Sequence, residues 1–417
     1  MAVSQVTWTA QQQAASRSRN GSLIVSAAAG SGKTAVLVQR VLEWITDPKD
    51  PCGIDELLVV TFTNAAAAEM RSKISDELHR RLAERPEDSG LRRQLALLGS
   101  SRIQTVHSFC QSLLREHFSL CGVDPDFRLA DETPCARLKE QALSAVLATA
   151  YARGETDFRA LCDSLTEGRS DEKLGETVLA LYERLRSHPA PERMLALLPE
   201  LCAAGPEGSG WGKYLQAAAA SRLEYELSAL ERICAEAETV PEVWEKYRAT
   251  LEQYRSFGLR LQESIRQGWD AACACLETFD KGRLAPCRYE DKAFVARIKA
   301  GKDRFAALVP LLKKEIYFSD VRRTLAEGRE SRPMAEALCR LTQQFTEQYQ
   351  ALKRQKNLLD FSDLEHLALH LLQAEDGGPS PLAAELRQGI RELLVDEYQD
   401  TNAIEEQIFN ALRQAGD

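Results

Sequence analysis

Apolar positions near both ends of the chain form short runs, and each run leads into a segment with helical spacing. The runs that predict buried strands lie at 22–27, 56–63, the start of 101–118, and 390–401. The segments that follow them repeat apolar residues about every 3.6 positions, which indicates amphipathic helices at 34–45, 64–82, the remainder of 101–118, and 403–414. Alternation of apolar strands with helices predicts an α/β fold whose parallel sheet carries helices on both faces.

The pattern changes in the middle of the chain. From about 135 to 355 the sequence is almost entirely amphipathic helix, interrupted by loops such as AAGPEGSGWG at 203–212. We therefore expect an α/β core at 1–125 and 356–417 and a large all-helical domain inserted at 126–355. Two helix starts are also expected: Asn64 as an N-cap, and a capping box formed by Ser362 and Glu365.

Length and composition narrow the class of protein. At about 150 residues per domain, 417 residues correspond to two or three domains. No apolar run approaches the roughly 18 residues of a membrane span, and the N-terminus lacks a secretory signal, so we expect an intracellular protein without a membrane partner. The eleven cysteines include no CxxC pair, which favours reduced thiols.

The net charge of −9 argues against a general nucleic-acid coat protein. A local DNA groove remains compatible with it, because phosphate contacts need only a few well-placed donors. Lys353, Arg354 and Lys356 lie together in LKRQKNLLDF. A solvated helix face is the favoured interpretation of these three cations, and a DNA-backbone patch is the alternative.

The segment 26–34, SAAAGSGKT, lies between a predicted strand and a predicted helix. In this context a glycine-rich loop presents backbone N–H groups to phosphates, and the helix N-terminus adds its positive end. Lys33 would reach the β- and γ-phosphates of ATP, and the Thr34 hydroxyl would bind Mg²⁺. The first position, usually Gly, is Ala27, which is a minor departure. The candidate ATP-binding residues of the loop are Ala27, Ala28, Ala29, Gly30, Ser31, Gly32, Lys33 and Thr34.

A second acidic motif complements this loop. In LLVDEYQD an apolar strand ends in Asp396, which predicts a carboxylate at the edge of the sheet where ligands bind in such folds. Asp396 would hold Mg²⁺, and Glu397 would orient or deprotonate the water that attacks the γ-phosphate. The alternative, a surface acidic cluster that closes a strand, loses weight because the phosphate loop is also present.

Four motifs in this order, AAAGSGKT, VVTFTNAAAAEM, IQTVHSFC and LLVDEYQDT, resemble those of superfamily 1A DNA helicases of the UvrD/Rep type. WTAQQ, DPDFRLADE and LLDFSDLEHLAL resemble the N-terminal part of the AddA subunits of bacterial AddAB helicase-nucleases. The motif resemblance covers about 1–130 and 355–417. It implies a RecA-like P-loop NTPase core, single-stranded and duplex DNA as partners, an AddB-like partner subunit, a role in DNA repair and a bacterial cytoplasmic location.

The resemblance also assigns residues. Gln12 matches the family's adenine-reading glutamine, and Gln399 matches the glutamine that senses the γ-phosphate. Local physics alone leaves the DNA residues open: Phe62 offers a stacking face and Thr63 and Asn64 suit a phosphate, but a strand end with a helix cap explains them equally. The same holds for the next motif, whose histidine is otherwise a core or capping residue. The candidate DNA-contact residues are Phe62, Thr63, Asn64, Thr105, His107 and Ser108.

The family pattern would continue beyond Asp417 with a second RecA-like domain, arginine fingers and, in AddA, a nuclease domain. We therefore expect this chain to correspond to the N-terminal portion of such an enzyme and to be nearly inactive in isolation. Two alternatives are a UvrD-like helicase unrelated to AddAB, and a non-motor ATP-dependent switch or scaffold. The motif TFTNAAAAEM disfavours the switch, which has no need of a DNA motif.

Overall fold

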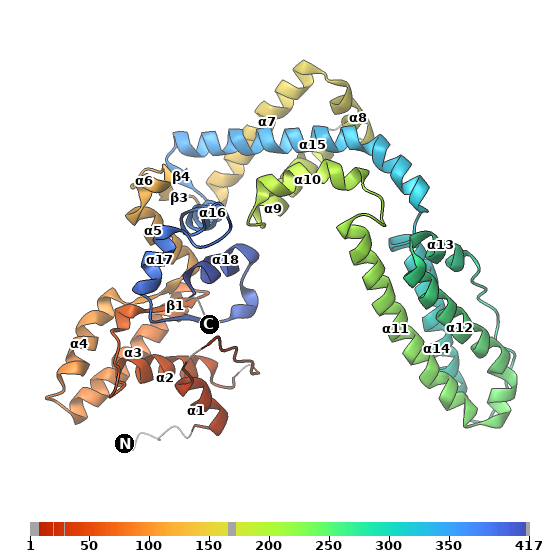
Figure 1. Ribbon diagram of the computed structural model, residues 1–417, viewed down its shortest axis with the longest axis horizontal. Helices are drawn as coiled ribbons and strands as arrows, with labels where there is room; N and C mark the ends of the chain where they lie inside the picture. The colour runs from red at the N-terminus through yellow and green to blue at the C-terminus, as the bar shows by residue number, and fades with distance from the viewer. Residues whose placement is uncertain (1–7, 20, 29, 166–171, 414–417) are drawn as a thin grey trace. The chain divides into compact units, whose positions relative to one another are not determined.

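The computed structural model describes residues 8–19, 21–28, 30–165 and 172–413 (Figure 1). The chain divides into two compact units. Unit 1 comprises Met1–Ala152, Glu172–Met194 and Thr342–Asp417, and unit 2 comprises Arg153–Asp171 and Leu195–Leu341. Among the described helices, none combines the length and apolar composition that crossing a membrane requires.

A small parallel sheet lies at the centre of unit 1. Its strands are β1 (Leu57–Thr61), β2 (Arg102–Thr105) and β5 (Glu392–Val395), in the order β2-β1-β5. The strands predicted from 56–63, 101–118 and 390–401 are therefore confirmed. A second parallel pair, β3 (Arg128–Leu129) with β4 (Leu358–Leu359), joins two segments of unit 1 that are far apart in the sequence.

Alternating side chains of β1 divide the core of unit 1 into two clusters. Leu58 and Val60 pack with α5 (Val106–Glu116), α16 (Phe361–Leu372) and α18 (Ala403–Leu412). Leu57 and Val59 pack with α2 (Lys33–Ile45) and α3 (Asn64–Glu84). Successive strand residues point to opposite faces, so helices cover both faces of the sheet.

The remaining elements are mostly helical. Unit 1 also contains α1 (Ala10–Arg17), α4 (Ser89–Leu97), α6 (Phe118–Cys121), α7 (Glu132–Arg153), α9 (Glu172–Arg186), α17 (Pro381–Gln388) and short 3₁₀ turns at Ile54–Glu56, Leu98–Ser100 and Tyr398–Asp400. Unit 2 contains α8 (Thr156–Leu165), α11 (Gly210–Glu238), α12 (Pro241–Gln267), α13 (Trp269–Glu277) and α14 (Lys292–Glu315). Two further helices, α10 (Pro191–Ala203) and α15 (Val321–Gln355), contain residues of both units. As predicted, the described residues between 135 and 355 form helices and loops.

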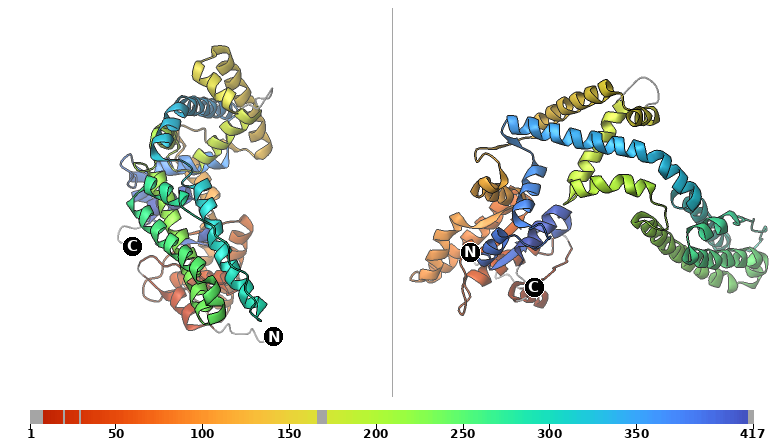
Figure 2. Two further views of the ribbon diagram at one scale, coloured as in Figure 1. Left: turned by 90° about the vertical axis from the view of Figure 1, so that its right-hand side faces the viewer. Right: turned by 45° about the horizontal axis from the view of Figure 1, so that its top comes forward.

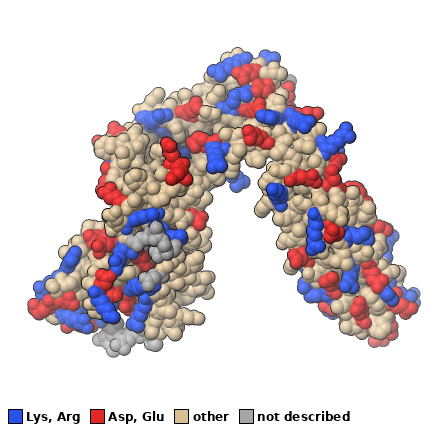
Figure 3. Space-filling view, viewed as in Figure 1, with Lys and Arg blue, Asp and Glu red and all other residues tan. Residues whose placement is uncertain are grey.

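Unit 2 is built around the long helices α11, α12 and α14, which lie side by side (Figure 2). Their core contains Leu223, Tyr254, Trp269 and Phe305, all nearly inaccessible to solvent. On the face seen in Figure 3, Lys and Arg side chains of these helices are interspersed with Asp and Glu. Exposed pairs of this kind contribute little to stability, so unit 2 is held together mainly by its apolar core.

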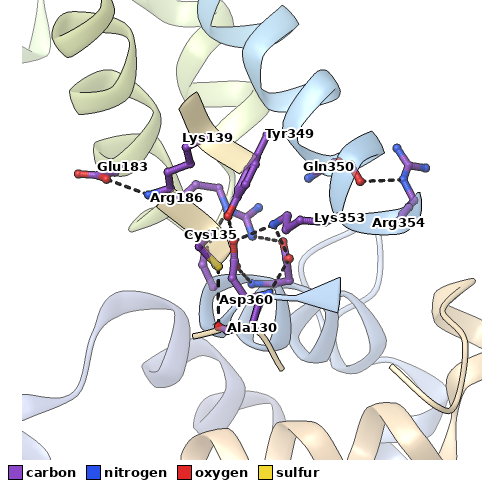
Figure 4. A network of polar contacts seen from close by, with 12 residues as sticks. Ala130, Cys135, Lys139, Glu183, Arg186, Tyr349, Gln350, Lys353, Arg354 and Asp360 are labelled. Atoms are coloured by element: carbon purple, nitrogen blue, oxygen red, sulfur yellow. Dashed lines mark hydrogen bonds and ion pairs between the residues drawn. The ribbon is translucent and has the colours of Figure 1, made fainter. Parts of the chain in front are cut away.

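A buried polar network joins the end of α15 to the start of α16 in unit 1 (Figure 4). Lys353 is 2% exposed, and its Nζ lies 2.7 Å from Asp360 Oδ2 and also contacts Asp363. From α9, Arg186 Nη2 lies 3.2 Å from Asp363 Oδ1. The prediction of a solvated face is therefore wrong for Lys353, because two carboxylates compensate its charge away from water. Arg354 and Lys356 are exposed, as predicted.

Two predicted helix caps are wrong. The N-cap of α3 is Thr63, whose hydroxyl accepts from Ala66 N at 3.1 Å, and Asn64 is the first helical residue. In α16 the capping box pairs Asp360 with Asp363 through hydrogen bonds of 2.9 and 3.0 Å, instead of Ser362 with Glu365. In each case an oxygen-bearing residue slightly earlier in the chain meets the free N–H groups first.

The strand expected at 22–27 is also wrong. This described segment has no regular secondary structure, and the side chain of Ile24 is 82% exposed, with Leu23 and Val25 about half exposed. Within the described sheet, β5 is an edge strand. An apolar run predicts a strand only if a partner covers it, and here no partner among the described residues does.

Candidate functional site

Three strands of unit 1 end at the same edge of the sheet. Because β1, β2 and β5 are parallel and Thr61 lies opposite Thr105, their carboxyl ends meet there. Phe62 follows β1, Val106 follows β2 and Asp396 follows β5. The segments with the predicted DNA and magnesium residues thus begin at one edge, the usual place for ligands in open parallel sheets.

The glycine-rich loop precedes α2. Gly30 and Gly32 have φ angles of +77° and +87°, which L side chains rarely adopt, and Gly32 is the N-cap of α2. Lys33 Nζ donates to the Ala27 carbonyl at 3.2 Å, and Ser31 N donates to Ala28 O at 3.2 Å. The loop thus folds back on itself beside the free N–H groups of the helix. The predicted residue Ala29 lies outside the described residues.

Gln12 contacts this loop. It occupies the third position of α1 and completes a capping box with Thr9, and its Nε2 donates to Ser31 O at 3.1 Å. The structure therefore brings Gln12 to the candidate ATP-binding loop, although the two are separated by nineteen positions in the sequence.

Arg40 is a residue of this region that the sequence motifs did not indicate. It is 8% exposed, and its guanidinium donates to the Ala15 carbonyl of α1 at 2.7 Å and to Glu392 of β5 at 2.8 Å. One side chain thus joins the helix of Gln12, the helix of Lys33 and the strand that ends at Asp396. The signal was an arginine within the otherwise apolar stretch TAVLVQRVLEWI.

Asp396 and Glu397 follow β5 directly. Asp396 N donates to Val60 O at 2.9 Å, which extends the ladder by one bond. Burial raises the pKa of Asp396, the charge of Glu397 raises it further, and the Lys33 ammonium opposes both. Lys33 and Asp396 therefore lie close enough to interact electrostatically. No hydrogen bond joins Thr34 to Asp396 in the part of the chain that the structure describes.

Glu397 is one of two described non-glycine residues with a positive φ, at +52°. A left-handed conformation costs an L residue about 1–2 kcal/mol, and such strain is concentrated at functional sites. The backbone N–H of Glu397 donates to Asp396 Oδ1 at 3.1 Å, and Gln399 Nε2 donates to Glu397 Oε2. The predicted general base and the predicted sensor glutamine are therefore in direct contact.

The predicted DNA residues after β1 differ in their local roles. Phe62 is 58% exposed, which leaves its ring available for stacking. The Thr63 hydroxyl caps α3, and Asn64 is exposed in the first turn. After β2, Thr105 is buried and caps α5, with its Oγ1 accepting from Ser108 N at 3.2 Å and lying 2.8 Å from Ser108 Oγ. Thr63 and Thr105 thus have a capping role, whatever else they contact.

His107 belongs to a charged network that the sequence motifs did not indicate. Its Nε2 lies 3.1 Å from Glu365 Oε1, and its ring meets Phe361 edge-on with centroids 4.9 Å apart. Asn402 Nδ2 donates to both Glu365 oxygens at 3.3 Å, and Asn402 N donates to Glu405 Oε2 at 3.1 Å. The signal was Glu365 itself, a carboxylate within the apolar pattern of LEHLALHLL.

The electrostatics of this network favour a charged imidazole. The hydrogen bond with Glu365 raises the pKa of His107, burial lowers it, and the charges of Glu365 and Glu405 raise it further, for a net increase. Burial raises the pKa of Glu405, while its bond from Asn402 and the charge of His107 oppose that. His107 is therefore paired with buried carboxylates and is not an isolated core histidine.

Comparisons with known proteins agree with these motifs. An ATP-dependent helicase/nuclease subunit of the AddA type from Geobacillus thermodenitrificans is 37% identical over 98% of this chain and 34% of its own length. The protein of the same name from Pelotomaculum thermopropionicum is 40% identical over 98% of this chain and 33% of its own length. The chain thus spans about a third of the length of these curated relatives. Residues 8–417 match the family described as "UvrD/REP helicase N-terminal domain", and the chain belongs to that family.

Proposed function

We propose that this chain binds Mg²⁺·ATP and forms the ATP-binding part of a DNA-translocating helicase. One observation carries the proposal: the Lys33 ammonium interacts electrostatically with Asp396, beside a loop whose two glycines have left-handed backbones. A lysine and a carboxylate in this relation suit a phosphate with a bound cation. Gln12, hydrogen-bonded to the same loop, is suited to reading the adenine.

The donor set fits a magnesium ion. The Thr34 hydroxyl and the Asp396 carboxylate are hard oxygen ligands, which Mg²⁺ prefers. Thr34 follows Lys33 in the first turn of α2, and Asp396 lies close enough to Lys33 to interact electrostatically with it. The ion would supply positive charge to the β- and γ-phosphate oxygens.

Three residues of the chain have the chemistry that hydrolysis needs. Lys33 would bind the γ-phosphate, and the Glu397 carboxylate would accept a proton from the attacking water or orient it. Gln399, in contact with Glu397, would report the state of the γ-phosphate to the DNA side. The left-handed backbone at Glu397 supports this role, because the chain accepts strain to hold that side chain in place.

We further propose that residues 1–125 and 356–417 form a RecA-like core and 126–355 an inserted helical domain. Phe62, Thr63, Asn64, Thr105, His107 and Ser108 would contact single-stranded DNA at the sheet edge. The names of the two helicase/nuclease relatives support a helicase acting with a partner protein in DNA repair. Those names favour this function over a UvrD-like helicase of another kind and over a non-motor switch.

Titration calorimetry with Mg²⁺·ATPγS tests the nucleotide site. Lys33→Ala should abolish detectable binding, because the ammonium is the principal charge facing the β- and γ-phosphates. Lys73→Ala is a matched control, since Lys73 pairs with Glu69 on the exposed surface of α3. Unchanged affinity in Lys33→Ala would show that the loop is not the nucleotide site.

A further inference from the structure

We propose that Glu365 is a positioning residue for DNA binding: it holds the His107 ring so that its second nitrogen, Nδ1, can donate to a DNA phosphate. The same carboxylate joins His107 to Asn402, which begins the helix after the Asp396–Glu397 loop. This inference rests on the proposed DNA-binding function and extends it to a residue outside the motifs that indicated that function.

The geometry of the ring carries the proposal. Nε2 is occupied by Glu365 Oε1 at 3.1 Å, and Nδ1 makes no hydrogen bond within the described chain. The His107 side chain is 38% exposed, whereas that of Glu365 is 10% exposed, so the ring stands between the buried carboxylate and solvent. Phe361 fixes the other side of the ring by its edge-on contact. A doubly protonated imidazole held in this way presents one N–H outward, which suits a phosphate oxygen.

The surrounding charges support a protonated ring. The groups that face His107 from neighbouring elements are Glu365 of α16 and Glu405 of α18, and on its own helix the nearest titratable group is Cys110. Burial raises the pKa of the Cys110 thiol well above its usual range, so this residue stays neutral. With two carboxylates and no competing cation among these groups, the imidazolium is the form that the site stabilises.

Asn402 connects this site to the loop after β5. Its Oδ1 accepts from Ile404 N and Glu405 N at 2.9 Å as the N-cap of α18, which fixes the orientation of the amide. Its Nδ2 must then point to Glu365, as observed at 3.3 Å. A shift of the loop that begins with Asp396 would therefore reach His107 through only two hydrogen-bonded side chains. This gives a physical route between nucleotide state and DNA affinity.

The positioning role can be measured without DNA. Imidazole NMR shifts should show that the pKa of His107 falls in Glu365→Gln, which keeps the shape and the bond from Asn402 but removes the charge. His107→Gln assigns the signal, and Glu385→Gln, an exposed carboxylate of α17, is the matched control. Glu365→Asp, which keeps the charge on a shorter side chain, should give an intermediate value. A pKa of His107 that is the same in all variants would overturn the proposal.

DNA binding is then followed by fluorescence anisotropy with labelled oligothymidylate of about 20 nucleotides, long enough for a typical site. Wild-type affinity should fall as the pH rises through the raised pKa of His107, because the donor on Nδ1 is lost. Glu365→Gln should bind about tenfold more weakly near neutral pH and should begin to lose affinity at lower pH. His107→Gln should be equally weak with no pH step.

Two failures are distinguishable. If the wild-type protein bound no oligothymidylate at any pH, the proposed DNA-binding function would fall together with this inference. If wild type bound and Glu365→Gln bound equally well with the same pH profile, this inference alone would fall and the DNA function would stand.

Discussion

Replacing Lys353 by methionine should strongly destabilise unit 1. Methionine keeps most of the side-chain volume and removes the ammonium, so Asp360 and Asp363 lose their shared cation. Their side chains are only 16% and 8% exposed, so water cannot replace it. Removing one partner of a buried ion pair costs about 3–5 kcal/mol. Arg186 remains beside Asp363, which favours the lower end, about 3 kcal/mol.

The assay must report on unit 1 specifically. Hydrogen exchange followed by mass spectrometry, across a urea series, gives the stability of peptides from α9, α15 and α16. A loss of about 3 kcal/mol corresponds to a fall in melting temperature of roughly 6–12 °C for a domain of this size. Lys356→Met is the matched control, because Lys356 is exposed three positions further along, and it should change stability by less than about 0.5 kcal/mol.

The effect should depend on pH with a defined sign. Burial raises the pKa of Asp360, but Lys353, the capping bond from Asp363 and Arg186 outweigh it, and the net pKa is below the usual value. A depressed carboxylate pKa gives stability that is present above the unfolded pKa of about 3.9 and is lost as pH falls through the lower folded value. The gap between wild type and Lys353→Met should therefore narrow below about pH 4.

A second variant separates lost charge from lost packing. Adding Asp360→Asn to Lys353→Met removes one uncompensated carboxylate and keeps a good N-cap, so part of the lost stability should return. The reasoning is refuted if Lys353→Met is as stable as Lys356→Met, or if the double variant is less stable than Lys353→Met.

Three further predictions concern the candidate nucleotide site. In a polypeptide with measurable ATPase activity, Glu397→Gln should keep nucleotide binding and lower turnover by roughly 10²–10⁴-fold, and undiminished turnover would exclude Glu397 as the base. Gly32→Ala, at a φ of +87°, should weaken Mg²⁺·ATP binding about tenfold by calorimetry, since an L residue there costs about 1–2 kcal/mol; equal affinity would mean the loop relaxes freely. Arg40→Met should lower the urea midpoint by the equivalent of about 3 kcal/mol, because it strands the buried Glu392, one of whose oxygens already lacks a partner, and Arg40→Lys should recover part of the loss.

Strand and helix periodicity was sufficient for most of the α/β framework. The runs that became β1, β2 and β5 are apolar and are followed by helices that bury them, so local pattern and tertiary structure agree. The run at 22–27 has the same local pattern, but strand formation depends on a neighbouring strand, and the sequence pattern contains no information about that pairing. The exposed Ile24 shows the difference between apolar composition and actual burial.

Charged residues inside helices were the least predictable part. Lys353 was interpreted as solvated because lysines usually are, yet its carboxylate partners come from the next helix and are positioned only by the turn between them. Arg40 joins three elements, and its partner Glu392 is 352 positions away in the chain. The motif residues were easier to find because glycine, lysine and aspartate at fixed spacing reflect local backbone geometry. Long-range ion pairs have no such local signature.

The helix α16 shows why its acidic residues could be misassigned. Residues two positions apart on a helix differ by about 200° around its axis, so Asp363 and Glu365 face opposite sides. Asp363 turns to Lys353 and Arg186, and Glu365 turns to His107 and Asn402. A capping box between Ser362 and Glu365 would have required Glu365 to face its own helix start, which would have broken the contact with His107. The short motif LLDFSDLEHLAL thus contains two buried ionic contacts on opposite faces of one helix. One anchors α16 to α9 and α15, and the other presents a carboxylate to the candidate DNA residue. Because the first fixes the rotation of the helix about its axis, it also fixes where Glu365 lies, and the anchoring network is therefore a condition for the positioning one.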